Sequence, residues 1–360
     1  MATPFSPLTL RSVTARNRIW IAPMCQYAVE RQDGVPTAWH AVHLGQFAIG
    51  GAGIVMAEAT AVSPEGRITP RDTGIWNDQQ AAAWAPIAAF ITSQGAVPAI
   101  QLAHAGRKAS TQPPWSTDKT GTVPVAEGGW ETLAPSAIAF TGYDAPTEMS
   151  LAQIAAVVRD FGAAARRAVD AGFRVIEVHA AHGYLLHSFL SPLSNTRTDS
   201  FGGSPENRAK LLELVIREVR TRIGDLPLFV RLSATDWAEG GLDTELITDI
   251  GRRAAEAGAD LLDVSTGGLV AEQSIPVAPL YQVPFAETLR KATGIPVAAV
   301  GLFTTPEQVG ETLEAEQADA ILIGREALRD PHFPLRAAHA LGAEIDYVPG
   351  PYARAPFGSR

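Results

Sequence analysis

Short apolar runs alternate with amphipathic stretches along most of the chain. Eight of the apolar runs are flanked by glycine, proline or polar residues, which is typical of buried strands. The predicted strands are residues 19–22, 53–57, 97–101, 174–178, 228–232, 260–264, 296–300 and 319–323. Eight strands that alternate with helices match the strand count of a closed parallel barrel. We therefore predict an α/β fold, a single (β/α)8 TIM barrel that occupies one domain over residues 1–360.

The stretches between these runs carry helix start and stop signals. Ser150 with Gln153 forms a capping box, and a helical stripe of apolar residues follows it as far as Gly172. Ser204 precedes a proline at the first position of the next predicted helix, which stops at Gly224. Thr305, also followed by proline, opens another helix. The alternation is thus one of strands and helices, as a barrel requires.

Three segments stand outside the alternation. Residues 8–13 are predicted to form an N-terminal cap over the bottom of the barrel. Residues 107–149 form a long excursion after the third strand, rich in Gly, Pro and Ser, with Trp115 and Trp130 in it. Loops of this length in compact domains are usually functional, so we expect a lid-like segment, although a surface insertion is the alternative. Residues 340–360 are expected to form a C-terminal tail.

Composition limits the partners and the compartment. The chain is 46% hydrophobic with a net charge of −9 and no run of lysine or arginine, so nucleic acid and anionic membranes are unlikely partners. We expect no signal peptide and no transmembrane segment, because the first residues lack a basic region before an apolar core and no later run is long enough. Cys25 is the single cysteine, which excludes an intrachain disulfide and favours a cytoplasmic location.

The C-terminal ends of the predicted strands carry the candidate chemistry. His179, His182 and Tyr184 follow the fourth strand together, at the rim where barrel enzymes place their active sites. A metal pair is disfavoured, because no glutamate lies between the histidines, and we predict no metal site. Glycines follow the sixth to eighth strands, where barrels bind phosphate through bare backbone N–H groups. No Rossmann fingerprint is present, since the glycine-rich segment 50–53 precedes a strand.

Long motifs at these strand ends resemble a known family. They are Ala22-Pro-Met-Cys-Gln-Tyr27, Glu58-Ala-Thr-Ala61, Gln101-Leu-Ala-His-Ala-Gly-Arg-Lys108, His179-Ala-Ala-His-Gly-Tyr184 with Gly202-Gly-Ser-Pro-Glu-Asn-Arg208, Val264-Ser-Thr-Gly-Gly268 and Ile323-Gly-Arg325. Together they resemble the old yellow enzymes, FMN-dependent ene reductases, and more narrowly the thermophile-type subclass, in which a cysteine follows the first strand. The resemblance extends from about residue 5 to residue 334.

The resemblance implies a non-covalently bound FMN that NADPH or NADH reduces. Matching motifs imply that the isoalloxazine is contacted by Ala22, Pro23, Met24, Cys25, Ala59, Gln101, His179 and Arg231. They imply that the phosphate is held by Gly301, Gly324 and Arg325. Physical chemistry agrees, since an arginine at a strand end stabilises negative charge on a reduced ring and a guanidinium offers paired donors to phosphate. A structural ion pair is the alternative role for each arginine.

The implied reaction is reduction of an activated C=C bond in an α,β-unsaturated carbonyl or nitro compound. His179 and His182 would donate hydrogen bonds to the substrate oxygen as it gains negative charge, and Tyr184 would protonate the α-carbon. Tyr27 would orient the substrate. Cys25 would tune the flavin potential without acting as a nucleophile, or would be a small buried hydrophobic residue.

The remaining candidates have structural alternatives. We expect structural roles for His40, His43, His104 and His187. Lys108 is expected either to contact the substrate or the loop after the first strand, or to be solvated. Tyr352-Ala-Arg354 matches a family segment that enters a neighbouring subunit's site in a homodimer or homotetramer, but the residues after it differ from the familiar ending, and a frayed tail is the alternative.

Two other functional classes stay open. A flavin barrel with another substrate class, acting on RNA or acyl-CoA, is disfavoured by the acidic balance and by the absence of an iron–sulfur cysteine set. A ligand-binding barrel without turnover would leave the set of hydrogen-bond donors unexplained.

Overall fold

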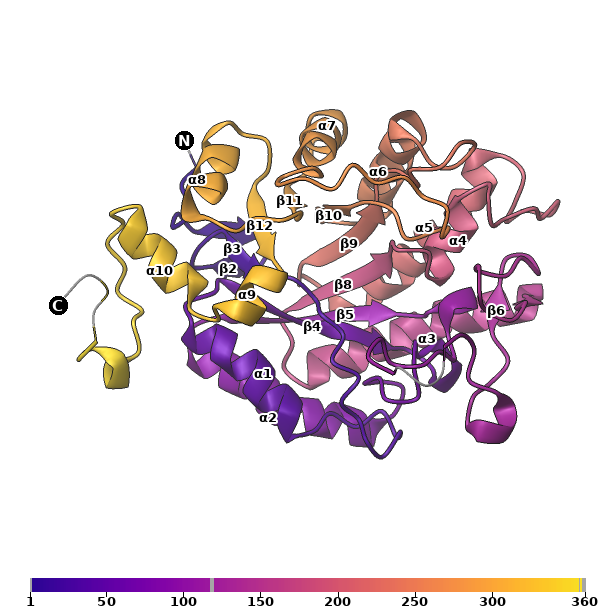
Figure 1. Ribbon diagram of the computed structural model, residues 1–360, viewed down its shortest axis with the longest axis horizontal. Coiled ribbons are helices and arrows are strands. Elements are labelled where there is room, and N and C mark those ends of the chain that lie inside the picture. Colours follow the sequence, from indigo (N-terminus) through magenta and orange to yellow (C-terminus); the bar gives the residue numbers. More distant parts are fainter. Residues whose placement is uncertain (1, 117–119, 356, 358–360) are drawn as a thin grey trace.

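Eight parallel strands close into a barrel in the computed structural model, which describes residues 2–116, 120–355 and 357 (Figure 1). Around the barrel, the strands are β3 (Ile19–Ile21), β4 (Ile54–Ala61), β5 (Val97–Ala103), β8 (Val175–Ala180), β9 (Leu228–Ser233), β10 (Leu261–Ser265), β11 (Val297–Ala299) and β12 (Ala320–Ile323). Every neighbouring pair is parallel, including β12 with β3, which closes the ring. The predicted (β/α)8 class and its eight strands are confirmed.

Five strands run further than predicted, namely β4, β5, β8, β9 and β10, and two of these extensions matter most. β4 continues four residues past the expected end at Ala57, because its register against β5 shifts between Ala57 and Ala59 and pairing resumes beyond the irregularity. β8 continues to Ala180, so His179 lies within the strand and not after it. All residues of both strands are buried, as expected for parallel strands covered on both faces.

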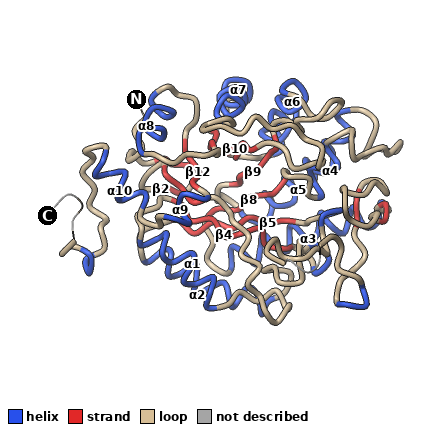
Figure 2. Tube along the Cα trace, viewed as in Figure 1, coloured by secondary structure: helices blue, strands red, loops and turns tan. Residues whose placement is uncertain are grey.

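Helices surround the barrel (Figure 2). Their bounds are α1 (Ala38–Ile49), α2 (Asp78–Ser93), α3 (Leu151–Asp170), α4 (Leu185–Leu190), α5 (Pro205–Ile223), α6 (Thr244–Ala257), α7 (Val283–Thr293), α8 (Pro306–Glu314), α9 (Arg325–Arg329) and α10 (Phe333–Ala340). The predicted N-caps form, since the side chains of Ser150, Ser204 and Thr305 each accept a hydrogen bond from the third backbone N–H of their helix. α5 ends at Gly224 as expected.

Large apolar side chains pack inside the lower part of the barrel, and a hairpin closes its lower end. The rings of Trp20 on β3 and Phe229 on β9 stack with centroids 5.7 Å apart, which places both inside the barrel because these strands lie on opposite sides of it. The hairpin consists of β1 (Leu8–Leu10) and β2 (Val13–Ala15). Ser12 at its turn donates to the backbone oxygen of Asp225, just before β9, so the predicted cap lies at the start of the strands.

The excursion and the tail lie at opposite ends of the long axis of the molecule (Figure 1). The excursion contains short helical turns and a two-stranded sheet, β6 (Leu133–Ala134) with β7 (Thr147–Glu148), and its residues 117–119 are outside the described part. The tail follows α10 and includes one turn at Gly350–Tyr352, whereas residues 356 and 358–360 are outside the described part. Among the helices described, none is long and apolar enough to cross a membrane.

Candidate active site

The turn after β8 brings the predicted hydrogen-bond donors together. His182 and Gly183 adopt positive φ values of 59° and 77°, which reverse the chain between His179 and Tyr184. A Cβ on Gly183 would lie 2.3 Å from the carbonyl oxygen of Gly268, so only glycine allows the loops after β8 and β10 to approach this closely. The local turn therefore depends on a contact between two loops.

The two histidines are neutral hydrogen-bonding groups. The backbone N–H of Ala181 donates to Nδ1 of His179 (3.2 Å), which leaves the proton of this ring on Nε2. That Nε2 lies 3.4 Å from Nδ1 of His182, whose own Nε2 lies 2.8 Å from the Ser265 hydroxyl. Burial, followed by the charge of Arg231, lowers the pKa of both histidines well below the usual value.

Tyr184 lies against an apolar wall. The sequence did not predict that the residues of this wall lie together. Five buried residues form this wall, Ala59, Ile68, Ala103, Ala105 and Ala109, and it packs against Cys25, Tyr27, Trp130 and Tyr184. The ring of Tyr184 meets that of His179 edge to face at 4.9 Å. Burial raises the pKa of the Tyr184 phenol well above its usual value, so the phenol keeps its proton.

Cys25 is held as a neutral thiol. Burial, together with the charges of Glu58 and Asp72, raises the pKa of the thiol well above the ordinary range. Interactions of its sulfur with the backbone of Ala59 and the side chain of Tyr27 lower the pKa of the thiol, but they do not offset the effect of burial. Since the thiolate is the reactive form of cysteine, this environment opposes nucleophilic chemistry at Cys25.

Polar residues form the floor beneath this cluster. Arg231 on β9 is level with His179 on β8, and its Nε lies 3.0 Å from Oδ2 of Asp263 on β10. Gln101 on β5 donates from Nε2 to Oε1 of Glu177 on β8 (2.7 Å). All are buried, so the two predicted residues Gln101 and Arg231 are each fixed by a buried carboxyl group.

The ends of β10, β11 and β12 meet around a polar cavity of about 220 Å³. Gly301, Gly324 and Arg325 line this cavity. A Cβ on Gly324 would lie 4.0 Å from both Ala22 and Met24, so the first and eighth strands deliver their predicted residues to the same place. Bare glycine backbone beside a guanidinium is suited to an anionic group.

Lys108 is the clearest departure from the sequence-based expectation. Its ammonium group donates to the backbone oxygens of His182 and Gly268, each at 2.9 Å, and lies 5.5 Å from the centre of the Tyr184 ring. Burial lowers its pKa to about 8. The solvated interpretation is wrong, because this lysine fastens the same two loops that Gly183 brings together.

Three further residues, none of them assigned a site role from the sequence, contact the site. Ser265 bonds His182, Gln282 accepts from the Thr266 hydroxyl beside the polar cavity, and Trp130 donates to the backbone oxygen of Glu65. Ser265 had a signal, since it ends the sixth barrel strand. No sequence signal identified Gln282, because it reaches the cavity from the start of α7 and not from a strand end.

The histidines expected to be structural have protein partners of their own, and Nδ1 of His187 accepts from the backbone N–H of Gly183 within the turn after β8. Nε2 of His40 lies 3.0 Å from Glu58, and Nε2 of His187 lies 2.8 Å from Asp236. His104 accepts from the backbone N–H of Gly106, and His43 packs against Phe47. Within the described ranges, no group of three or more His, Cys, Asp or Glu side chains is arranged to hold a metal ion.

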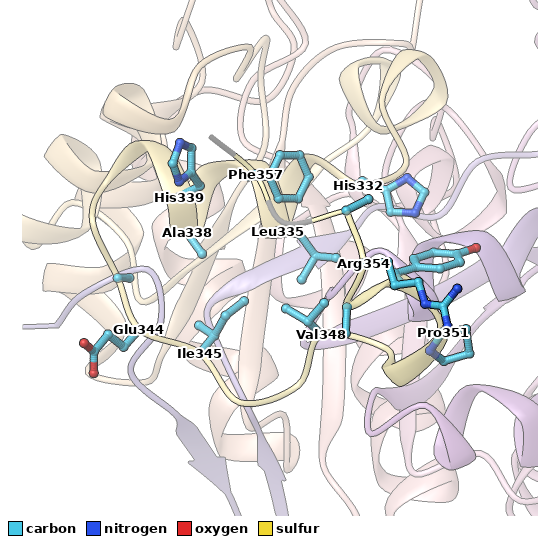
Figure 3. Close-up of a pocket in the computed structure, with 14 residues that line it drawn as sticks. His332, Leu335, Ala338, His339, Glu344, Ile345, Val348, Pro351, Arg354 and Phe357 are labelled. Carbon is cyan, nitrogen blue, oxygen red and sulfur yellow. The ribbon is translucent and has the colours of Figure 1, made fainter. Parts of the chain in front are cut away.

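The tail forms a separate hollow of about 870 Å³ with α10 (Figure 3). Arg354 lines it together with apolar residues that include Leu335, Val348 and Phe357. Arg354 is exposed, and the predicted site residues of the barrel do not line this hollow. The proposed reach of Arg354 into a neighbouring subunit stays a prediction.

Comparisons with known proteins agree with this architecture. The model of the NADH:flavin oxidoreductase / NADH oxidase family matches residues 4–344. The chain is 47% identical to an NADPH dehydrogenase of Listeria monocytogenes over 356 residues, 99% of each chain. It is 46% identical to an NADPH dehydrogenase of Bacillus subtilis over 342 residues, 95% of this chain and 96% of the relative.

Solved structures are similar over most of their length. An old yellow enzyme homologue from Zymomonas mobilis superposes with a TM-score of 0.78 at 29% identity, covering 96% of this chain and 94% of that one. Morphinone reductase in complex with tetrahydroNAD gives a TM-score of 0.79 at 28% identity, covering 96% and 92%.

Proposed function

Because this chain belongs to the NADH:flavin oxidoreductase / NADH oxidase family and is an NAD(P)H-dependent flavin oxidoreductase of the old yellow enzyme type, we propose that it reduces activated C=C bonds of α,β-unsaturated carbonyl or nitro compounds. One observation carries the proposal. Two neutral histidines and a protonated tyrosine meet on the turn after β8, beside an apolar wall. Such a set can bind an oxygen and deliver a proton, as conjugate reduction requires.

The residues present fit FMN. The polar cavity between Gly301, Gly324 and Arg325 would take the phosphate, and the adjoining residues Ala22, Pro23, Met24, Cys25, Ala59, Gln101, His179 and Arg231 would hold the ring. The fit rests on an arginine and bare backbone at one end and on buried hydrogen-bonding groups at the other. When bound, FMN supplies the hydride that it has accepted from NADPH or NADH.

His179 and His182 are proposed to bind the substrate oxygen. Nε2–H of His179 is preset as a donor, since the Nδ1 atom of the same ring accepts from Ala181. Because both rings are neutral, neither can transfer a full proton to the substrate oxygen at neutral pH. Preorganised donors of this kind stabilise negative charge as it develops.

Tyr184 is proposed to protonate the α-carbon. Its phenol keeps its proton because burial raises its pKa, and its position against His179 places it next to the oxygen-binding pair. Tyr27, which shares the apolar wall, would orient the substrate, and Cys25 would tune the flavin from a neutral thiol. The excursion would act as a lid, since Trp115 meets the Tyr27 ring at 5.6 Å.

Assembly and location extend the proposal. We expect a homodimer or homotetramer in which Arg354, exposed on the tail, approaches a neighbouring site. A cytoplasmic setting would suit a chain whose single cysteine is a neutral thiol.

An anaerobic titration tests the proposal. The purified protein should be yellow, NADPH should bleach it, and 2-cyclohexenone should restore the colour with stoichiometric formation of cyclohexanone. Bleaching without recovery would point to another substrate class, and yellow protein that NADPH does not bleach would point to a binding barrel without turnover.

A further inference from the structure

Two acidic side chains are buried inside the barrel, below the donor cluster. Glu177 on β8 and Asp263 on β10 are both 0% exposed, and each carboxyl group influences the pKa of the other. Oε2 of Glu177 and Oδ1 of Asp263 have no hydrogen-bond donor among the described residues. A buried carboxylate oxygen without a donor disfavours the ionised form, and a second carboxylate nearby disfavours it further, so the two groups are not expected to be ionised together.

The surroundings of the pair supply a single positive charge. Gln101 on β5 donates a neutral amide hydrogen bond to Glu177, whereas Arg231 on β9 pairs with Asp263. His179 above them is neutral. On β4, Glu58 is occupied by His40 and by the backbone N–H of Gln26, and β3, β11 and β12 carry no titratable side chain.

We propose that Glu177 and Asp263 share one proton at neutral pH, held on Glu177, and that the pair thereby fixes the net charge around Arg231. The asymmetry of partners explains the location of the proton, because Asp263 has the arginine and Glu177 has only an amide. Burial also raises the pKa of Glu177 well above its usual value and that of Asp263 to about 6, with Arg231 opposing the rise for both.

The consequence for the flavin rests on the proposed function, in which Arg231 contacts the ring. One guanidinium is balanced by one negative charge on the pair, so the floor is neutral. Reduction adds negative charge to the ring, and the pair limits how strongly Arg231 favours the reduced form. Glu177 and Asp263 are thus positioning residues that act through Arg231.

A double-mutant cycle on the flavin reduction potential tests the charge state. Glu177→Gln removes the carboxyl group and keeps the oxygen that accepts from Gln101. Asp263→Asn lets Glu177 ionise in its place. Each single variant therefore keeps one negative charge and should change the ratio of affinities for reduced and oxidised FMN by no more than about twofold.

The double variant removes the charge altogether. It should raise this ratio about tenfold, which is about 30 mV for a two-electron couple. Equal shifts in the two single variants that add in the double variant would mean two ionised carboxylates and would overturn the inference. The matched control is Asp260→Asn, which removes an arginine-paired aspartate at the other end of the same strand and should leave the potential unchanged.

A second measurement does not depend on flavin or on the stability of the double variant. Difference infrared spectra of wild-type apoprotein against Glu177→Gln should contain the carbonyl stretch of a protonated carboxylic acid, shifted in D2O. A missing band would refute the shared proton. If the band is present but the wild type, the two single variants and the double variant all have the same flavin reduction potential, the link to Arg231 and the flavin is refuted. The 2-cyclohexenone titration would still decide the proposed function separately.

Discussion

The two ends of the barrel differ in the ionisation of their side chains. At the lower end, Asp260 pairs with Arg220 and with Arg11 of the hairpin, and Asp319 lies 3.0 Å from Nε of Arg290. At the upper end, the titratable groups of the donor cluster are buried and neutral.

This difference indicates that the lower end of the barrel stabilises the fold, whereas the upper end is suited to chemistry. Ion pairs near the surface connect loops at a small net gain, whatever the identity of the partners. Burial at the upper end shifts the pKa values of His179, His182, Tyr184 and Cys25 towards the uncharged form, downwards for the histidines and upwards for the tyrosine and the cysteine. Neutral groups that retain their protons are suited to hydrogen bonding and proton donation.

Removing the proposed proton donor should have the largest effect. Tyr184→Phe deletes only the phenolic oxygen and should slow alkene reduction by roughly 10²–10⁴, as is typical of a lost general acid. Reduction of the flavin by NADPH should be nearly unchanged, because no proton from Tyr184 is needed there. Stopped-flow measurement of the two half-reactions separates the effects.

The matched control for this variant is Tyr347→Phe. Tyr347 is a partly buried tyrosine at the tail, where its hydroxyl bonds the Asn17 side chain, so both half-reactions should keep their rates. If Tyr184→Phe slowed both half-reactions equally, or neither, Tyr184 would not be the proton donor.

Removing one of the proposed oxygen-binding donors should have the next largest effect. His179→Ala or His182→Ala should slow alkene reduction by about 10²–10³ and weaken binding of phenol-like ligands, while FMN stays bound. His339→Ala, on the exposed end of α10, serves as the control and should change neither property. Unaltered alkene reduction in both site variants would remove the pair from this role.

The same histidines predict how stability depends on pH. Their folded pKa values lie well below the unfolded value of about 6.5, so the unfolded chain binds protons first as the pH falls. Their contribution to stability is complete above that pH and is lost progressively below it. In wild-type protein, the free energy of unfolding should therefore fall below pH 6.5 more steeply than in the double alanine variant.

The sequence predicted the fold well because its signals are local. Apolar runs and caps such as Ser150 and Thr305 depend on neighbouring residues, and these elements formed as expected. The extension of β4 was missed because the irregularity at Ala57 and Ala59 is set by pairing with β5, about forty residues further along the chain.

The site was predictable where it lies at strand ends and unpredictable where it depends on contacts between loops. His179, His182 and Tyr184 could be grouped from their common strand. Lys108 could not be placed, because its partners are backbone oxygens 74 and 160 residues away. Every residue has a backbone carbonyl, so the sequence does not indicate which of them accepts a hydrogen bond from a side chain.

The smallest effect is expected at the lower end of the barrel. Arg11 lies 3.5 Å from Asp225, and the two side chains are 38% and 71% exposed. Asp225→Asn should therefore lower the free energy of unfolding by less than about 1 kcal/mol, and salt should reduce even that difference. Chemical denaturation at low and high ionic strength measures it.

The same variant also tests whether the two ends are independent. Asp225→Asn keeps the backbone oxygen that accepts from Ser12, so the hairpin should stay in place. Both half-reactions and the flavin potential should match the wild type, because the change removes an exposed charge below the barrel and leaves the buried floor intact. A shift in flavin potential comparable to that of the Glu177 and Asp263 double variant would show that charges at the lower end influence the flavin. The conclusion that the two ends have independent roles would then be wrong.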